Sequence, residues 1–226
     1  MTDEVTNQPL LPLVDACEAA FEEHGDTYLG VGWTKSQENA ELRYQVMLDV
    51  VRPDGPAPAT LLDLGCGASH LLEHIHRSGA DGIVYSGLDV SKLFIDVSRA
   101  KFPDVDYYLG DIHDSALAVP VFDYVVMNGV FTYKGPLSFD QMVRQWERLV
   151  TAAIAHARVG VVFNTSSPYV DWQRDDLFHP PMSVLTDFMA RSACPYFVVR
   201  HDYGLYETAV YAYRAPAVSR RPRAGG

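Results

Sequence analysis

The sequence contains 226 residues, 48% of them hydrophobic, and carries a formal net charge of −11 with a pI near 5.0. A chain of this length and composition suits one α/β domain with an appended segment and argues against a second full domain. The acidic balance argues against DNA or RNA as a partner, because a long phosphate backbone requires a positively charged surface.

The first 58 residues are expected to form a helical segment in front of the main domain. After a polar, proline-bearing arm at residues 1–12, apolar side chains recur at helical spacing from Leu13 to His24. A second helical run begins at Ser36 and stops at the stretch 52–56, which contains proline and glycine. Two helices are therefore predicted ahead of the first strand.

Residues 59–214 alternate between short apolar runs and amphipathic helical runs. The expected strands cover residues 60–64, 82–88, 105–109, 122–127 and 159–164, and helical runs begin near residues 67, 91 and 138 between them. This alternation is typical of an α/β fold with a mostly parallel, doubly wound sheet and helices on both faces. Two β-rich runs near the end, 196–201 and 206–214, predict a C-terminal antiparallel hairpin. Residues 215–226 are rich in proline, arginine and glycine and are expected to form a disordered tail.

A glycine-containing turn follows the first expected strand, in the stretch Asp63-Leu64-Gly65-Cys66-Gly67-Ala68-Ser69. Glycine at positions 65 and 67 can adopt positive φ and lets an adenosine-bearing ligand lie against the main chain at a helix N-terminus. The dinucleotide fingerprint G-x-G-x-x-G would require a third glycine at position 70, where the chain has His70. A nicotinamide-dependent oxidoreductase is therefore the least favoured alternative.

The pattern of an acid, two glycines and a small residue at Asp63, Gly65, Gly67 and Ser69 resembles the first motif of the class I S-adenosylmethionine-dependent methyltransferases. Ser69 stands where that family frequently has a third glycine. The resemblance spans about residues 60–214. It implies a Rossmann-like seven-stranded sheet, S-adenosylmethionine as the cofactor, and an N-terminal lid over the pocket. A looser similarity, to methyltransferases of bacterial sugar and secondary-metabolite pathways, is carried by Gly32-Trp33-Thr34, Glu41-Leu42-Arg43-Tyr44 and residues 201–207.

Polar residues stand at the ends of the expected strands, where open α/β sheets bind ligands: Asp63, Asp89, Asp111, Asn128 and Asn164. Asp89 follows Gly67 by 22 positions and is placed to accept hydrogen bonds from the ribose hydroxyls, with Val90 beside it in the site. The resemblance implies that Asp111 takes the adenine amino group and that Ile112 offers its backbone amide. A helix cap at Asp89 and an ordinary turn at Asp111 are the structural alternatives.

The methionine part of the cofactor has two candidate partners. In the family, the acid at the position of Asp63 commonly orients the loop or meets the methionine amino group, and bracing of the loop alone is the alternative. Arg43 is the candidate for the methionine carboxylate, because it lies in the segment expected to fold over the pocket. A solvated helical arginine is the alternative there.

Methyl transfer from a sulfonium needs little covalent help, so the protein contributes mainly by holding the acceptor in line. Asn128 ends the fourth expected strand, and the family's fourth motif implies that it orients the acceptor. A hydroxyl acceptor also benefits from a base near neutral pH, for which His179 and Asp171 in the loop after the fifth strand are the candidates. His113 and His24 are reserves for that role.

The sequence therefore predicts a methyltransferase that uses S-adenosylmethionine and acts on a small molecule, on oxygen in preference to nitrogen. An N-methyltransferase of a small amine and a non-catalytic cofactor-binding protein are the alternatives. Three widely spaced cysteines and the absence of convincing metal-ligand spacing predict neither disulfides nor a metal. Without a signal peptide or an apolar run of membrane length, a cytoplasmic protein without a membrane partner is expected, and a homodimer stays open.

Overall fold

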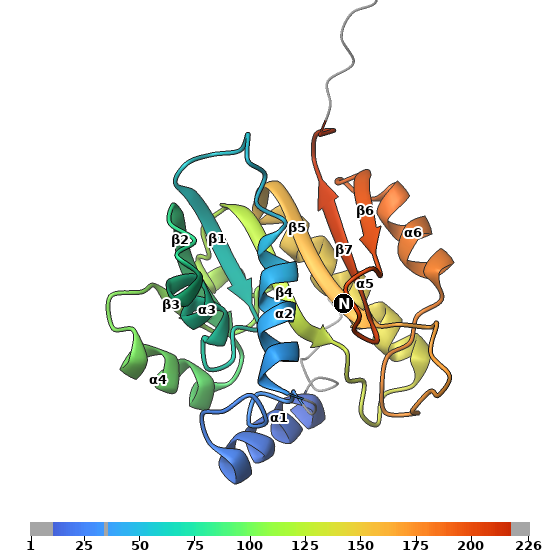
Figure 1. The fold of residues 1–226 in the computed structure, drawn as a ribbon, viewed down its shortest axis with the longest axis horizontal. Helices are drawn as coiled ribbons and strands as arrows, with labels where there is room; N and C mark the ends of the chain where they lie inside the picture. The colour runs from blue at the N-terminus through green and yellow to red at the C-terminus, as the bar shows by residue number, and fades with distance from the viewer. Residues whose placement is uncertain (1–10, 34–35, 218–226) are drawn as a thin grey trace, which may run out of the picture.

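The computed structural model describes residues 11–33 and 36–217, and its centre is one seven-stranded sheet (Figure 1). The strands lie side by side in the order β3-β2-β1-β4-β5-β7-β6. Their bounds are β1 Ala59–Leu64, β2 Ile83–Asp89, β3 Tyr107–Leu109, β4 Phe122–Phe131, β5 Ala157–Ser166, β6 Tyr196–Arg200 and β7 Glu207–Tyr213. The helices are α1 Leu11–His24, α2 Gln37–Leu48, α3 His70–Ser78, α4 Lys92–Lys101, α5 Phe139–Ala155 and α6 Met182–Arg191, with a short 3-10 turn at Ser115–Leu117.

Strand direction follows the predicted plan. β1 pairs parallel with β2 and β4, β2 with β3, and β4 with β5. β7 lies between β5 and β6 and runs antiparallel to both. The Rossmann-like sheet with a C-terminal antiparallel hairpin is thus confirmed.

Two apolar clusters sandwich the sheet. Alternate residues of β4 point to opposite faces, so that Val125 and Met127 join one cluster while Tyr124 and Val126 join the other. The first cluster holds the inner faces of α5 and α6, and the second holds those of α2 and α3. Figure 1 shows α2 in front of the sheet and α5 behind it.

Several boundaries differ from the predicted ones near the carboxyl edge of the sheet. β4 continues beyond Met127 to Phe131, because after a register shift Phe131 pairs with Thr165 of β5. α3 begins at His70 instead of residue 67, since the backbone at Ser69 has a φ of 61° and does not fit a helix. The turn before α3 is therefore longer than predicted, which leaves more free backbone at this edge.

The N-terminal segment contains the two predicted helices. α1 has no buried residue; its Phe21 ring lies 5.3 Å from that of Phe94, and its Glu18 carboxylate accepts a hydrogen bond from the Ser91 hydroxyl at 2.5 Å. α1 begins at Leu11, so the last two residues of the predicted arm are helical. The rest of that arm, and residues 218–226 of the predicted tail, lie outside the described residues. No helix in the described part of the chain combines the length and apolar character needed to cross a membrane.

Candidate functional site

A cavity of about 710 Å³ opens where β1, β2 and β4 end, and residues of α1 line it from the opposite side. Its volume falls within the range of small-molecule sites. All nine residues that the sequence places at the cofactor line this one cavity: Arg43, Asp63, Gly65, Gly67, Asp89, Val90, Asp111, Ile112 and Asn128. The fold thus brings together residues that are up to 85 positions apart in the sequence.

The turn after β1 is held in place by its backbone. Gly65 and Gly67 have φ values of 80° and 51°, a region that favours glycine. The amides of Gly65 and Cys66 donate to the Leu88 carbonyl at 2.8 and 3.1 Å. These bonds fix the turn against the end of β2 and place its glycines at the cavity.

Asp89 organises the same end of the sheet. One carboxylate oxygen accepts a hydrogen bond from the Gly67 amide and the other from the Ser91 amide, both at 2.9 Å. Burial raises the pKa of this carboxyl group. The backbone amides that donate hydrogen bonds to it act in the opposite direction. Each oxygen keeps a lone pair for a further donor, such as a ribose hydroxyl. The capping and ribose-binding interpretations of Asp89 are therefore compatible.

Ser69 occupies the position of the family's frequent third glycine and has a φ of 61°, which is unusual for a residue with a side chain. Its hydroxyl lies 2.8 Å from the hydroxyls of both Ser98 and Tyr107. Ser98 in turn donates to the Gly67 carbonyl at 2.9 Å. This buried hydroxyl network stabilises Ser69 in the left-handed conformation and links the turn to Ser98 and Tyr107.

Asp63 is buried at the end of β1 and accepts a hydrogen bond from the Tyr85 hydroxyl at 2.9 Å. Burial raises its pKa to about 7, with a smaller contribution from nearby Asp89, while the Tyr85 bond opposes the rise. The carboxyl group therefore changes charge near neutral pH, and a cationic ligand group in the cavity would favour its ionised form.

Arg43 forms a buried ion pair that no pattern in the sequence predicts. Its Nε donates to Glu207 Oε1 at 2.6 Å, and its guanidinium lies 4.3 Å from the centre of the Trp33 ring. The other Glu207 oxygen accepts from Asn164 at 2.8 Å, and Asn164 accepts from the Gly129 amide at 2.7 Å. The 164 positions between the partners leave no local signal for this pair. The final stretch noted for its family similarity does end at Glu207.

Two buried polar atoms of cavity-lining residues lack a partner among the described residues: Arg43 Nη1, a donor, and Asn128 Oδ1, an acceptor. Since an unpaired buried polar group is costly, these atoms are suited to bind a ligand. Together with Asp63, Asp89 and the glycine turn, they match a ligand with a carboxylate, an ammonium and a ribose. The hydrogen-bond donors and acceptors of the cavity thus fit S-adenosylmethionine.

The remaining cofactor candidates are Val90, Asp111 and Ile112, which also line the cavity. Ile112 is buried, and Val90 is largely exposed at the edge of the cavity. Asp111 accepts hydrogen bonds from the backbone amide and the ring Nδ1 of His113 at 3.0 and 2.8 Å. The position of Asp111 suits an adenine contact, and its role there stays a prediction.

The predicted base residues lie beside the cavity instead of lining it. Asp171 is exposed, and the His179 ring packs edge-on against that of Trp172, which does line the cavity. His179 Nδ1 lies 2.7 Å from the Ser167 carbonyl, so Nδ1 carries the proton. Its Nε2 is buried without a partner in the described chain and is the free acceptor. Both catalytic roles stay predictions.

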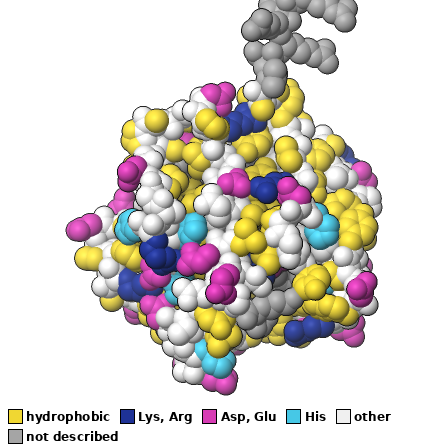
Figure 2. Space-filling model, in the orientation of Figure 1, with side chains coloured by type: hydrophobic (Ala, Val, Ile, Leu, Met, Phe, Trp, Pro, Cys, Tyr) yellow, Lys and Arg dark blue, Asp and Glu magenta, His cyan; other side chains and the backbone are white. Residues whose placement is uncertain are grey.

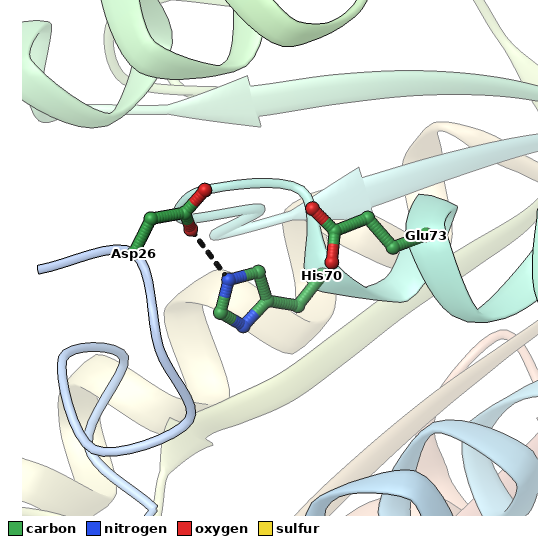
Figure 3. Close-up of side chains that lie close together, drawn as sticks. All are labelled: Asp26, His70 and Glu73. Atoms are coloured by element: carbon green, nitrogen blue, oxygen red, sulfur yellow. Dashed lines mark hydrogen bonds and ion pairs between the residues drawn. The ribbon is translucent and has the colours of Figure 1, made fainter.

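Among the described residues, potential metal ligands come together where atoms of Asp26, His70 and Glu73 lie within 4.8 Å of one another (Figure 3). His70 Nε2 contacts Asp26 at 2.6 Å. The Lys101 ammonium bonds Asp26 at 2.8 Å and Glu73 at 2.5 Å. A lysine that bridges both carboxylates supplies the positive charge a metal would bring, so this arrangement is an ion-pair cluster. Asp26 lies 44 positions before His70, which is why spacing along the sequence did not reveal it.

Comparison with known sequences agrees with this geometry. A family model described as a methyltransferase domain matches residues 61–152. A protein of Mycobacterium tuberculosis, provisionally named a methyltransferase, is 28% identical over 163 residues, which cover 70% of this chain and 95% of that protein. A sugar N,N-dimethyltransferase of Streptomyces venezuelae, named for dTDP-3-amino-3,4,6-trideoxy-α-D-glucopyranose, is 30% identical over 99 residues, or 42% of this chain and 38% of that enzyme.

Solved structures share the fold. Magnesium protoporphyrin IX methyltransferase from Synechocystis with bound S-adenosylmethionine superposes with a TM-score of 0.63 at 12% identity, covering 95% of this chain and all of that one. An amino pentose methyltransferase from Micromonospora echinaspora superposes with a TM-score of 0.55 at 19% identity, covering 88% of this chain and 97% of that one. At these identities the likeness concerns the fold.

Four observations lead to one conclusion: the motif, the order of the strands, the polar groups of the cavity and the matching family model. Residues 61–152 match the methyltransferase-domain family, and the fold and the cavity agree with an S-adenosylmethionine-dependent methyltransferase that has S-adenosylmethionine as its cofactor.

Proposed function

We propose that the protein methylates a small polar molecule of the sugar or secondary-metabolite type. The observation that carries this proposal is the extent of the cavity, which continues beyond the cofactor candidates to Tyr133, Trp172, Arg174 and Tyr206. These side chains offer aromatic faces and polar groups to a ligand in the cavity. A cavity of about 710 Å³ leaves room for a small acceptor beside the cofactor.

The residues of the chain have distinct tasks in such a reaction. When bound, S-adenosylmethionine supplies an electrophilic methyl group. Asp89 and the glycine turn hold the ribose end, while Asn128 Oδ1 can accept a hydrogen bond from the acceptor and orient it. α1 covers the cavity with Leu13, Val14, Cys17 and Ala20, and this cover excludes water from the acceptor.

A hydroxyl oxygen is the first candidate for the methylated atom. His179 supports it, because the bond from Nδ1 to the Ser167 carbonyl leaves Nε2 as the nitrogen that can accept a proton. The ring stands behind Trp172, so a modest shift of that side chain, or a bridging water, would connect the base with the acceptor.

A nitrogen is the second candidate, and the relatives support it. Two matching enzymes are named as N,N-dimethyltransferases of dTDP-linked amino sugars, one from Streptomyces venezuelae and one from Saccharopolyspora spinosa. A neutral amine needs no base for the transfer, which suits a cavity whose acceptor end contains no histidine among its described lining residues.

The test uses sugars that differ only in a hydroxyl or an amino group at one carbon, incubated with the purified protein and methyl-labelled S-adenosylmethionine. Transfer to either series, identified by mass spectrometry, would support the proposal and name the atom. Loss of transfer in His179→Ala with unchanged cofactor affinity would assign the base. A protein that binds the cofactor but labels no acceptor of either series would instead favour the non-catalytic alternative.

Two expectations about partners belong to the same proposal. The net charge of −11 supports a small molecule over a nucleic acid, and Lys and Arg side chains lie scattered among Asp and Glu on the face seen in Figure 2. A homodimer stays a prediction, which light scattering of the purified protein would test.

A further inference from the structure

An aromatic corner stands at the acceptor end of the cavity. Trp172 and Tyr206 both line the cavity and are 42% and 50% exposed, whereas Trp33 and Trp146 are only 8% and 0% exposed. The ring centres of Trp172 and Tyr206 lie 5.7 Å apart at an angle of 68°. Two large rings that meet at an angle and remain open to solvent form a surface against which another ring can lie.

Arg174 stands beside this corner with its guanidinium plane fixed. Its Nε donates to Asp176 Oδ1 at 2.9 Å, and its Nη2 contacts the other Asp176 oxygen. Asp176 therefore binds the edge of the guanidinium group that Nε and Nη2 form. The hydrogens of Nη1 take no part in this contact. A planar guanidinium group that binds Asp176 with one edge, and whose Nη1 has no hydrogen-bond partner among the described residues, is suited to bind a phosphate or a carboxylate.

Asp176 lies near two positively charged side chains. Lys134 adds a second positive charge near Asp176, and together with Arg174 it keeps the pKa of that carboxyl group below its usual value. Asp171 and Asp175, two further acids of the same loop, are exposed, and like Lys134 they do not line the cavity. Of the charged side chains in this loop, Arg174 and Asp176 line the cavity.

The loop that carries these side chains is anchored to the end of β4. The Asp176 carbonyl accepts from the Lys134 and Gly135 amides at 2.9 and 3.1 Å, and the Phe178 amide donates to the Thr132 carbonyl at 3.0 Å. Tyr133 forms a bridge with Leu177. In Figure 1 the loop lies at the end of the sheet where the arrowheads of β1 and β4 point. The backbone of the loop next to Arg174 is therefore anchored before a ligand arrives, which reduces the entropic cost of binding.

We propose that Trp172, Tyr206 and Arg174 form the recognition site for an acceptor that carries both a ring and an anionic group. The ring lies against the two aromatic side chains, and the anion binds Arg174 at the outer end of the cavity. The acceptor atom then lies inward, toward Asn128. This inference rests on the proposed small-molecule function and narrows its substrates to phosphorylated or carboxylated ring compounds.

The test uses the protein saturated with S-adenosylhomocysteine, whose own binding is titrated first. Four probes follow by calorimetry and by tryptophan fluorescence with acrylamide as quencher: dTDP-glucose and glucose 1-phosphate as phosphate probes, 4-hydroxybenzoate as a carboxylate probe, and glucose as the neutral control. Because Trp172 is the most exposed of the tryptophans, ligand contact should protect the accessible part of the emission from acrylamide.

We expect at least one anionic probe to bind, and Trp172→Ala and Arg174→Gln each to raise its Kd about tenfold or more with the S-adenosylhomocysteine affinity unchanged. The matched controls are Tyr196→Ala and Arg191→Gln, which alter exposed side chains away from the cavity and should leave the Kd unchanged. Binding of the phosphate probes alone identifies a phosphorylated acceptor, and binding of 4-hydroxybenzoate alone identifies a carboxylate.

The proposal fails if no anionic probe binds to the S-adenosylhomocysteine complex, or if one binds with the same Kd after Arg174→Gln. In either case, methyl transfer to a neutral sugar would leave the proposed function standing. If S-adenosylhomocysteine itself does not bind, the first titration reveals this, and the proposed function falls together with the inference.

Discussion

The two ends of the cavity are built in different ways. At the cofactor end, backbone amides of the turn after β1 bond to the end of β2 and to Asp89. At the proposed acceptor end, side chains of the loop between β5 and α6 meet the turn between β6 and β7, and two of their large rings remain exposed. A backbone-built end suits a group that every member of a family binds. An end built from loop side chains can change its ligand without changing the fold.

One buried network connects four elements beside the cavity. It runs from Trp33 and Arg43 through Glu207 and Asn164 to the Gly129 amide, which follows Asn128 at the centre of the site. Because it ties α2 to β7, β5 and β4, the network should support both ends together. Its removal is the strongest test of whether the two ends behave independently.

Arg43→Ala should have the largest effect. Removing one member of a buried ion pair leaves the other charge without a partner, which costs about 3–5 kcal/mol. In a chain of this size such a loss lowers the melting temperature by roughly 6–20 °C. Thermal unfolding without cofactor measures the effect on the fold alone, apart from any contact of Arg43 with the cofactor.

The double variant Arg43→Met/Glu207→Gln removes both charges and should recover part of the lost stability. Arg191→Ala, at the exposed end of α6, is the control for loss of an arginine. A melting temperature for Arg43→Ala within about 2 °C of the natural protein would show that the pair contributes little to stability.

Asp89→Ala should act mainly on the cofactor end. The change removes an acceptor for two backbone amides and the predicted acceptor for the ribose. A loss of about 2.7 kcal/mol in binding free energy is expected, which corresponds to a Kd for S-adenosylmethionine that is about 100-fold higher. Calorimetry measures it, with Asp81→Ala as the control at an exposed aspartate. A folded variant with unchanged affinity would remove Asp89 from the ribose site.

The same contrast explains what could be predicted from the sequence. The alternation of strands and helices gives the sheet, and the spacing from Asp63 to Ser69 gives the turn, because both depend on neighbouring residues. The partners of Arg43 and of His70 could not be predicted, since they lie 164 and 44 positions away and meet only through the order of the strands and helices. The placement of Trp172 in front of His179 depends on the path of a loop, which no periodic pattern encodes.

Gly65→Ala compared with Gly67→Ala separates steric contact from backbone strain at the turn. Both glycines have positive φ, so either alanine should cost about 1–2 kcal/mol. At Gly65 a Cβ would also lie 2.7 Å from a methyl group of Val130, whereas at Gly67 nothing lies within 4 Å. Gly65→Ala should therefore lower both stability and cofactor affinity more than Gly67→Ala. Adding Val130→Ala should remove that difference, and equal effects of the two single changes would rule out the steric part.

The pH dependence of stability should report on Asp63. Its pKa of about 7 in the folded protein lies above the usual value near 3.8, so the folded state binds this proton more tightly than the unfolded state. The stability that this group contributes is therefore fully present below its ordinary pKa of 3.8, falls as the pH rises from there to about 7, and changes no further above that pH. Between pH 6 and pH 8 the expected loss is about 1.4 kcal/mol.

Asp63→Asn keeps an acceptor for the Tyr85 hydroxyl but cannot ionise, so the fall between pH 6 and pH 8 should disappear in urea titrations of this variant. Saturating S-adenosylmethionine should also reduce the fall in the natural protein, because an ammonium beside Asp63 favours the ionised carboxylate. If the cofactor leaves the slope unchanged, Asp63 braces the turn and does not contact the methionine amino group. The cofactor end would then depend mainly on backbone contacts, in contrast to the side chains that form the proposed acceptor end.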